Sequence, residues 1–196
     1  NIDSGRAEKL KGVRAIVTGK DFPKRFGLVL RDQVYLAVDR VRYAGEPVVG
    51  VAAEDLDTAM EALELIEVDY EPLPASFDPE ESLREDAFLI HPDLGDYECT
   101  PSFHPVPGTN VANHLKVRTG DVNKGFGESD IVYEGTYTTQ AVHHVYLEPN
   151  AHVAQFTSDG RLNLWADTQT TYLSRLKLSE TLGLPMSKIR VMATHV

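Results

Sequence analysis

The sequence has a single cysteine, no long hydrophobic run and no concentration of positive charge. One cysteine cannot form an internal disulfide or ligate an iron–sulfur cluster alone, so electrons from any redox reaction must leave through a bound cofactor or another polypeptide. This cysteine usage favours reducing cytoplasm as the compartment. No stretch approaches the roughly 18 apolar residues of a membrane span. The first residues also lack the apolar core of a signal peptide.

The charge balance argues against one large class of partner. The sequence has 19 lysines and arginines against 30 aspartates and glutamates, which gives a formal net charge of −11. Phosphates would find no basic cluster to bind, so nucleic acid is not expected as a partner. The acidity favours solubility. The hydrophobic share of 42% and the charged share of 25% are those of ordinary globular protein.

The first third of the sequence predicts a compact unit of mixed helix and strand. Branched or continuous apolar residues predict strands at 13–18, 34–38 and 47–53. Asp55 can accept the free N–H groups of a following helix, so we expect it to be the N-cap. An apolar stripe on that helix is formed by Leu56, Met60 and Leu63. Alternation of Ile66, Val68 and Tyr70 with acidic residues then predicts a half-exposed strand.

The middle of the sequence, residues 76–113, has scattered prolines and no periodicity, which indicates a linker. Its apolar side chains should be draped over a neighbouring part; they are Phe88, Leu89, Ile90, Tyr97 and Phe103. We therefore expect three parts, with bounds 1–78, 79–114 and 115–196.

The last part of the sequence is predicted to be rich in strands. Regular structure should return at 115–117, followed by a Gly120-Asp121 turn and a strand at 131–139. A hairpin is expected from strands at 151–157 and 162–166, joined by Ser158-Asp159-Gly160. A helix at 171–182 should end at Gly183 and Pro185, and a strand should follow at 189–194.

The densest cluster of chemically active side chains lies at 140–149. If this segment is extended, His144, Tyr146 and Glu148 share one face, and His143, Val145 and Leu147 share the other. A metal site, and hence a small metallohydrolase, could use His143, His144, Glu148 and His152. Adjacent histidines on a strand point in opposite directions, however, so packed or hydrogen-bonded histidines are favoured. No nucleophile elbow, Walker loop or dinucleotide fingerprint is present.

Several segments, in order, resemble the molybdopterin-binding subunits of the xanthine dehydrogenase/aldehyde oxidase family. Residues 12–21, 41–53 and 66–74 resemble the α/β hammerhead domain of that family. Five later segments resemble the start of the molybdenum-binding domain of that family: residues 120–122, 135–137, 144–149, 165–169 and 182–185. The resemblance implies an α+β chain: an N-terminally truncated hammerhead domain at 1–78, a linker, and the β-rich first part of a molybdopterin-binding domain at 115–196.

The resemblance also implies a reaction and a set of partners. The family hydroxylates an electron-poor carbon of an aldehyde or an aromatic heterocycle, with oxygen from water, and some members reduce an aromatic thioester. Its molybdenum is held by the dithiolene of the pterin, of which a cytosine dinucleotide form is one variant, so no protein metal ligand is needed. FAD and 2Fe-2S clusters are expected on partner domains or subunits. The other expected partners are the rest of the molybdenum-binding domain and a small-molecule substrate. The resemblance also allows a homodimer.

At the residue level the resemblance reaches only the surroundings of His144. Gln140, Val142, His143 and His144 are expected near the molybdenum cofactor. Many family members have a glutamine two positions before this histidine, where its amide bonds an oxygen ligand of molybdenum, but Val142 cannot do so. Gln140 would need a bulge to substitute. The Thr168-Gln169 pair is expected to support, from behind, a loop that follows the last strand.

No catalytic residue is expected within this chain, because the glutamate base of the family lies far beyond Val196. The chain alone is therefore expected to be inactive and to retain no pterin. A second hypothesis, which Val142 favours, is a non-catalytic scaffold or interface module that has lost the cofactor.

Overall fold

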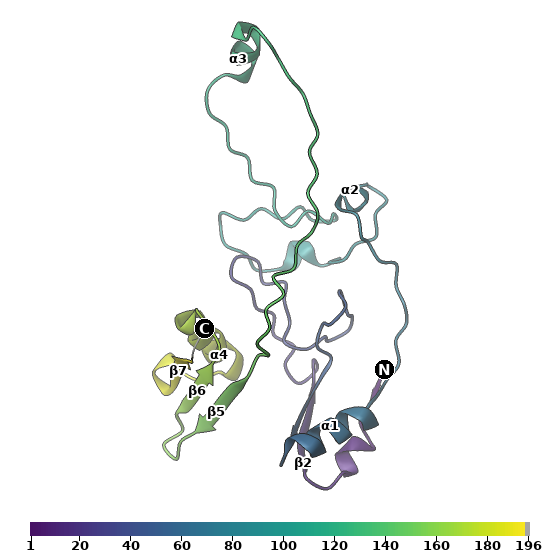
Figure 1. The fold of residues 1–196 in the computed structure, drawn as a ribbon, viewed down its shortest axis with the longest axis vertical. Helices are drawn as coiled ribbons and strands as arrows, with labels where there is room; N and C mark the ends of the chain where they lie inside the picture. The colour runs from purple at the N-terminus through teal and green to yellow at the C-terminus, as the bar shows by residue number, and fades with distance from the viewer. Residues whose placement is uncertain (195–196) are drawn as a thin grey trace. The chain divides into compact units, whose positions relative to one another are not determined.

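The computed structural model describes residues 1–194 and divides the chain into two compact units, Asn1–Leu115 and Lys116–Val196 (Figure 1). Helices and strands are both present in each unit, which confirms the predicted α+β class. None of the helices in residues 1–194 is long and apolar enough to cross a membrane.

An antiparallel strand pair and one helix form the centre of the first unit. Strand β2 (Val13–Thr18) pairs with β3 (Val49–Ala53), with a register shift between Val13 and Ala15. Helix α1 (Leu56–Leu65) contacts both strands and the short 3-10 helix η1 (Ala7–Lys9). The strands predicted at 13–18 and 47–53 are confirmed, although the second begins only at Val49.

The predicted cap of α1 is confirmed, and the apolar stripe predicted on this helix is exposed within residues 1–194. The Asp55 carboxylate accepts a hydrogen bond from the Thr58 backbone N–H at 2.8 Å, and this bond lowers the pKa of Asp55 below its ordinary value. Leu56, Met60 and Leu63 are 75, 52 and 44% exposed. The helix instead buries Ala62, which is fully covered, as is Ala7 of η1, a helix that contacts α1. Two small side chains let these elements approach closely.

Two further strands predicted for this unit are wrong or much reduced. Residues 34–38 form bends, and Ala37 donates its backbone N–H to the Pro47 carbonyl at 2.7 Å, outside any ladder. The Phe26 and Tyr35 rings stack at 4.3 Å, so local packing replaces strand pairing there. The half-exposed strand after residue 65 is reduced to β4 (Glu67–Val68), which pairs with β1 (Ile2–Asp3). β4 is short because β1 pairs with it at only two residues, Ile2 and Asp3, which the sequence pattern could not show.

The segment predicted to be a linker packs into the first unit. It contains the short helices α2 (Pro79–Ser82) and η2 (Leu94–Asp96). Leu94 and Tyr97 are buried together with Leu30, and Phe103 packs against this cluster. The Arg31 N–H donates to the Glu98 carbonyl at 2.9 Å, so backbone bonds also hold the segment. The draping expected of its aromatic side chains is thus confirmed for Tyr97 and Phe103.

His91 and Tyr97 form the polar part of this contact. His91 Nδ1 lies 3.1 Å from the Tyr97 hydroxyl, and the Arg25 guanidinium lies 4.4 Å from the centre of the Tyr97 ring. Burial, and then the positive charge of Arg42, lower the pKa of His91 below its ordinary value of 6.5; Arg25 acts in the same direction, against Asp32 and Glu46. The neutral imidazole is therefore the form that fits the folded unit.

The second unit is built on the three-stranded sheet β5-β6-β7. Strands β5 (His152–Phe156) and β6 (Leu162–Ala166) are antiparallel, and β7 (Ile189–Ala193) runs parallel to β6. Helix α4 (Thr171–Leu182) connects β6 to β7 and lies against β7, so the parallel pair has a helical crossover (Figure 1). The predicted hairpin, helix and last strand are confirmed. Gly183 ends α4 in the left-handed conformation, with φ +68°.

Residues 116–151 contain one regular element, α3 (Val122–Glu128), which Asp121 caps by accepting the Lys124 N–H at 3.0 Å. The strand predicted at 131–139 and the regular structure predicted at 115–117 are wrong. Exposed apolar residues in the first of these ranges include Ile131, Val132, Tyr133 and Tyr137. A strand needs a neighbour for its backbone N–H and C=O groups, and residues 1–194 supply none to this segment.

Replacing Gly183 by alanine should destabilise the second unit by about 1 kcal/mol, because an L-residue is strained in the left-handed conformation. Chemical denaturation followed by the fluorescence of Trp165 in β6 measures this change. Gly125→Ala is the matched control, since Gly125 lies within α3 without a positive φ and with open space around its Cα. It should not lower the free energy of unfolding; equal losses in both variants would contradict the assignment.

Acidification should loosen the segment that carries His91 and Tyr97. The folded-state pKa of His91 is below the unfolded value of 6.5, so the stabilisation is complete above that value and is lost as the pH falls below it. Amide hydrogen exchange of residues 88–103, corrected for the intrinsic pH dependence, should lose protection between pH 7 and pH 5. His91→Gln should flatten this dependence, whereas His114→Gln should leave it unchanged.

Candidate functional site

Three segments of the second unit meet at one end of its sheet. His152 at the start of β5 is opposite Ala166 at the end of β6, which is beside Ala193 at the end of β7. We call this the carboxyl end of the sheet. Residues 140–151 arrive there and residues 167–169 leave from it. Ligands of sheets with helical crossovers bind beyond the carboxyl ends of parallel strands, which makes this end the candidate site.

The segment expected to meet the cofactor is exposed and irregular. Gln140, Val142, His143 and His144 are all exposed, and no strand includes them. Val145 has a φ of +52°, and its N–H donates to His143 Nδ1 at 2.9 Å. A β-branched residue is strained in this conformation, and such strain is concentrated at functional sites. The kink also means that residues on either side of Val145 do not form the continuous extended face that alternation required.

Asp167 was missed by sequence reasoning, although it follows directly after β6. Its side chain is 17% exposed, and its Oδ1 is buried without a hydrogen bond. His152 Nδ1 lies 3.0 Å from that oxygen, in a geometry that is not that of a hydrogen bond. An acidic residue next to a buried strand end, opposite a histidine, was the available signal. The sequence pattern had suggested His152 only as a metal donor.

The neighbouring hydroxyl groups stabilise the turn into α4. Thr168 Oγ1 lies 3.4 Å from Thr170 Oγ1 and 3.3 Å from Ser174 Oγ. The Thr194 N–H donates to the Ala166 carbonyl at 3.1 Å, so the chain leaving β7 remains tied to the end of β6. Thr168 therefore has the local contacts of a supporting residue, while Gln169 is exposed.

The side chains considered for a metal site are not brought together. No group of three or more histidine, cysteine, aspartate or glutamate side chains suited to a metal ion occurs within residues 1–194. His143, His144, Glu148 and His152 thus form no such group in this part of the chain. The metallohydrolase hypothesis loses the geometry on which it depended.

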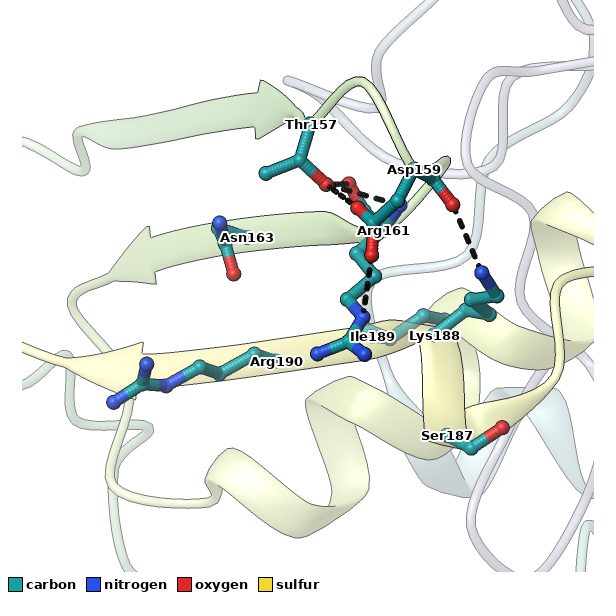
Figure 2. A pocket seen from close by; sticks show the side chains of 8 residues that line it. All are labelled: Thr157, Asp159, Arg161, Asn163, Ser187, Lys188, Ile189 and Arg190. Carbon is teal, nitrogen blue, oxygen red and sulfur yellow. Dashed lines mark hydrogen bonds and ion pairs between the residues drawn. The ribbon is translucent and has the colours of Figure 1, made fainter.

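The opposite end of the sheet has a shallow cavity of about 310 Å³ (Figure 2). It is lined by Thr157, Asp159, Arg161, Asn163, Ser187, Lys188, Ile189 and Arg190. The Thr157 hydroxyl donates to the Asp159 carboxylate at 2.5 Å, and Arg161 Nε lies 2.9 Å from the same carboxylate. Both contacts lower the pKa of Asp159, and the hydrogen bond from Thr157 lowers it more. Lys188 Nζ donates to the Asp159 carbonyl at 2.8 Å. These polar groups bind one another and stabilise the hairpin turn.

Two family models match the chain. The model described as "Aldehyde oxidase and xanthine dehydrogenase, a/b hammerhead domain" matches residues 1–74. The model described as "Molybdopterin cofactor-binding domain" matches residues 103–196, which include the carboxyl end of the sheet.

Curated relatives and solved structures agree with these models. The chain is 38% identical over 191 residues to a probable xanthine dehydrogenase subunit of Bacillus subtilis, covering 96% of this chain and 24% of the relative. It is 33% identical to the nicotinate dehydrogenase large molybdopterin subunit of Eubacterium barkeri, covering 97% and 42%. A structure of CO dehydrogenase from Oligotropha carboxidovorans aligns with a TM-score of 0.80 and 31% identity over 100% of this chain and 25% of that one.

The chain belongs to the xanthine dehydrogenase/aldehyde oxidase family of molybdenum hydroxylases, as its sequence predicted. Within that family it corresponds to part of the large, molybdopterin-binding subunit. It spans only about a quarter to two fifths of the length of the two relatives named above.

The purified chain should bind no stoichiometric zinc, because its histidines do not converge. Metal analysis after dialysis against zinc, with and without the double substitution His143→Gln/His144→Gln, measures this. One zinc per chain, lost in the double variant, would restore the metallohydrolase hypothesis.

Proposed function

We propose that the complete protein containing this chain is a molybdenum-dependent oxidoreductase that hydroxylates an electron-poor carbon of an aldehyde or aromatic heterocycle. The observation that carries this proposal is the match of residues 103–196 to the molybdopterin cofactor-binding domain, in the unit that contains the carboxyl end of the sheet. The named relatives act on different small molecules, so the substrate class is taken from the family as a whole. The chain alone contributes one wall of the site and no catalytic base.

Within this wall, Gln140, His143 and His144 would hold the cofactor by hydrogen bonds. These side chains fit the cofactor because their polar atoms are free to bond it. Gln140 and His144 are exposed and make no hydrogen bond within residues 1–194. The only hydrogen bond of His143 in this part of the chain comes from the Val145 N–H. Val142, 80% exposed, can offer only an apolar contact. Molybdopterin supplies the two-electron redox chemistry when bound, and a cytosine dinucleotide form is compatible with these contacts.

Electron transfer requires partners outside this chain. Its one cysteine, Cys99, cannot ligate a cluster alone, so the 2Fe-2S clusters would belong to partner domains or subunits. The family assigns FAD to such a partner as well. We place the reaction in the cytoplasm, and a homodimer of the complete protein is compatible with this assignment. The bounds 1–78, 79–114 and 115–196 remain our proposal for the parts of this chain.

A non-catalytic scaffold of the same fold is the second candidate. The position two residues before His144 is Val142, which cannot hydrogen-bond an oxygen ligand of molybdenum. This residue is the observation that favours loss of the cofactor.

The test is the molybdenum and pterin content of the complete natural reading frame that includes residues 1–196. Produced in a host that loads a known molybdenum hydroxylase, it should contain about one molybdenum and one pterin per chain. Residues 1–196 alone should retain neither, because most of the cofactor contacts lie elsewhere. A complete protein without molybdenum, beside a fully loaded control enzyme, would support the scaffold instead. Oxidation of aldehydes and N-heterocycles with an artificial electron acceptor then gives the substrate class.

A further inference from the structure

We propose that His152 and Asp167 form a positioning pair that holds residues 140–151 in place at the carboxyl end of the sheet. The pair acts on the cofactor only through that segment. Its consequence for cofactor binding rests on the function proposed above, whereas its effect on the segment does not.

The first argument is the environment of the Asp167 carboxylate. Its Oδ1 is buried and accepts no hydrogen bond within residues 1–194. Burying an oxygen away from water without a hydrogen bond costs free energy, and the cost is larger when the group is charged. His152 Nδ1 lies 3.0 Å from that oxygen. The imidazole of His152 is therefore the polar group that contacts the buried oxygen from the start of β5.

The second argument is the position of His152 in the chain. It is the first residue of β5, and its Cα partner across the ladder is Ala166, directly before Asp167. Residues 140–151 make a single hydrogen bond among the described residues, from the Val145 N–H to His143 Nδ1, within the segment itself. The contact between His152 and Asp167 therefore lies at the point where this segment meets the sheet. It fixes the direction from which residues 140–151 approach the sheet.

The hairpin offers a matched control at its other end. Asp159 and Arg161 form an ion pair of 2.9 Å on the same two strands, next to the turn that joins them. That pair contacts neither residues 140–151 nor the carboxyl end. Asp159→Asn removes the same charge from the same hairpin as Asp167→Asn, so a difference between the two variants reports position rather than general loss of charge.

The first experiment is amide hydrogen exchange of the complete protein produced without molybdenum. His152→Gln and Asp167→Asn should each raise the exchange rate of peptides from 140–156 by about 2- to 5-fold, as expected for loss of a partly exposed polar side-chain contact. The double variant should resemble the single ones, because each removes the same contact. His152→Lys, which supplies a positive charge at the same position, should restore most of the protection.

Asp159→Asn should leave the exchange of these peptides unchanged, and general unfolding is monitored on peptides of α1 in the first unit. Equal exchange in Asp167→Asn and wild type would overturn the proposal. Additive effects of the two single substitutions, or no recovery with His152→Lys, would do the same.

The second experiment measures molybdenum content after production in a loading host. Asp167→Asn and His152→Gln should contain several-fold less molybdenum than Asp159→Asn. If the wild-type complete protein contains none, the proposed function fails, while the exchange experiment still decides whether the pair positions the segment. If wild type and all variants are equally loaded, the pair has no role in cofactor binding and that part of the proposal is wrong.

Discussion

The parallel pairing of β6 with β7 is the constraint on which the second unit depends. Parallel strands need a crossover, and α4 supplies it by returning the chain from Ala166 to Ile189. Because β5 is antiparallel to β6, the start of β5 lies at the end where the other two strands finish. That arrangement brings the segment before His152, the turn at Asp167 and the end of β7 to one place. The residues of the candidate site therefore come from segments that are separated in the sequence.

Many large apolar side chains outside this sheet are exposed within residues 1–194. Apolar side chains such as Leu56 of α1 and Ile131 are more than two-thirds exposed within residues 1–194, although their sequence patterns are those of buried elements. The chain spans about a quarter of the length of several of its relatives. The first unit compensates in part, since the segment around Tyr97 packs onto Leu30 and gives this unit a core of its own.

Local signals were the reliable part of sequence interpretation. The α4 helix was placed at its observed bounds because Gly183 and Pro185 end it unambiguously, and the β5–β6 hairpin because Asp159-Gly160 favours a tight turn. The strand predicted at 131–139 is wrong because a side-chain pattern cannot supply a pairing partner for the backbone. The cofactor contact expected of Val142 and His144 comes from the resemblance, and both residues are exposed in the structure.

The sequence by itself determined the family, the α+β class and the elements whose ends are marked by capping residues and turns. These depend on contacts within a few residues or on an ordered set of segments, both of which are readable along a chain. Only the tertiary structure decided that Asp167 has a buried oxygen beside His152, and that residues 76–113 form part of a core. Both facts depend on segments about 15 to 65 residues apart in sequence that meet in space, and a one-dimensional pattern carries no record of burial between them.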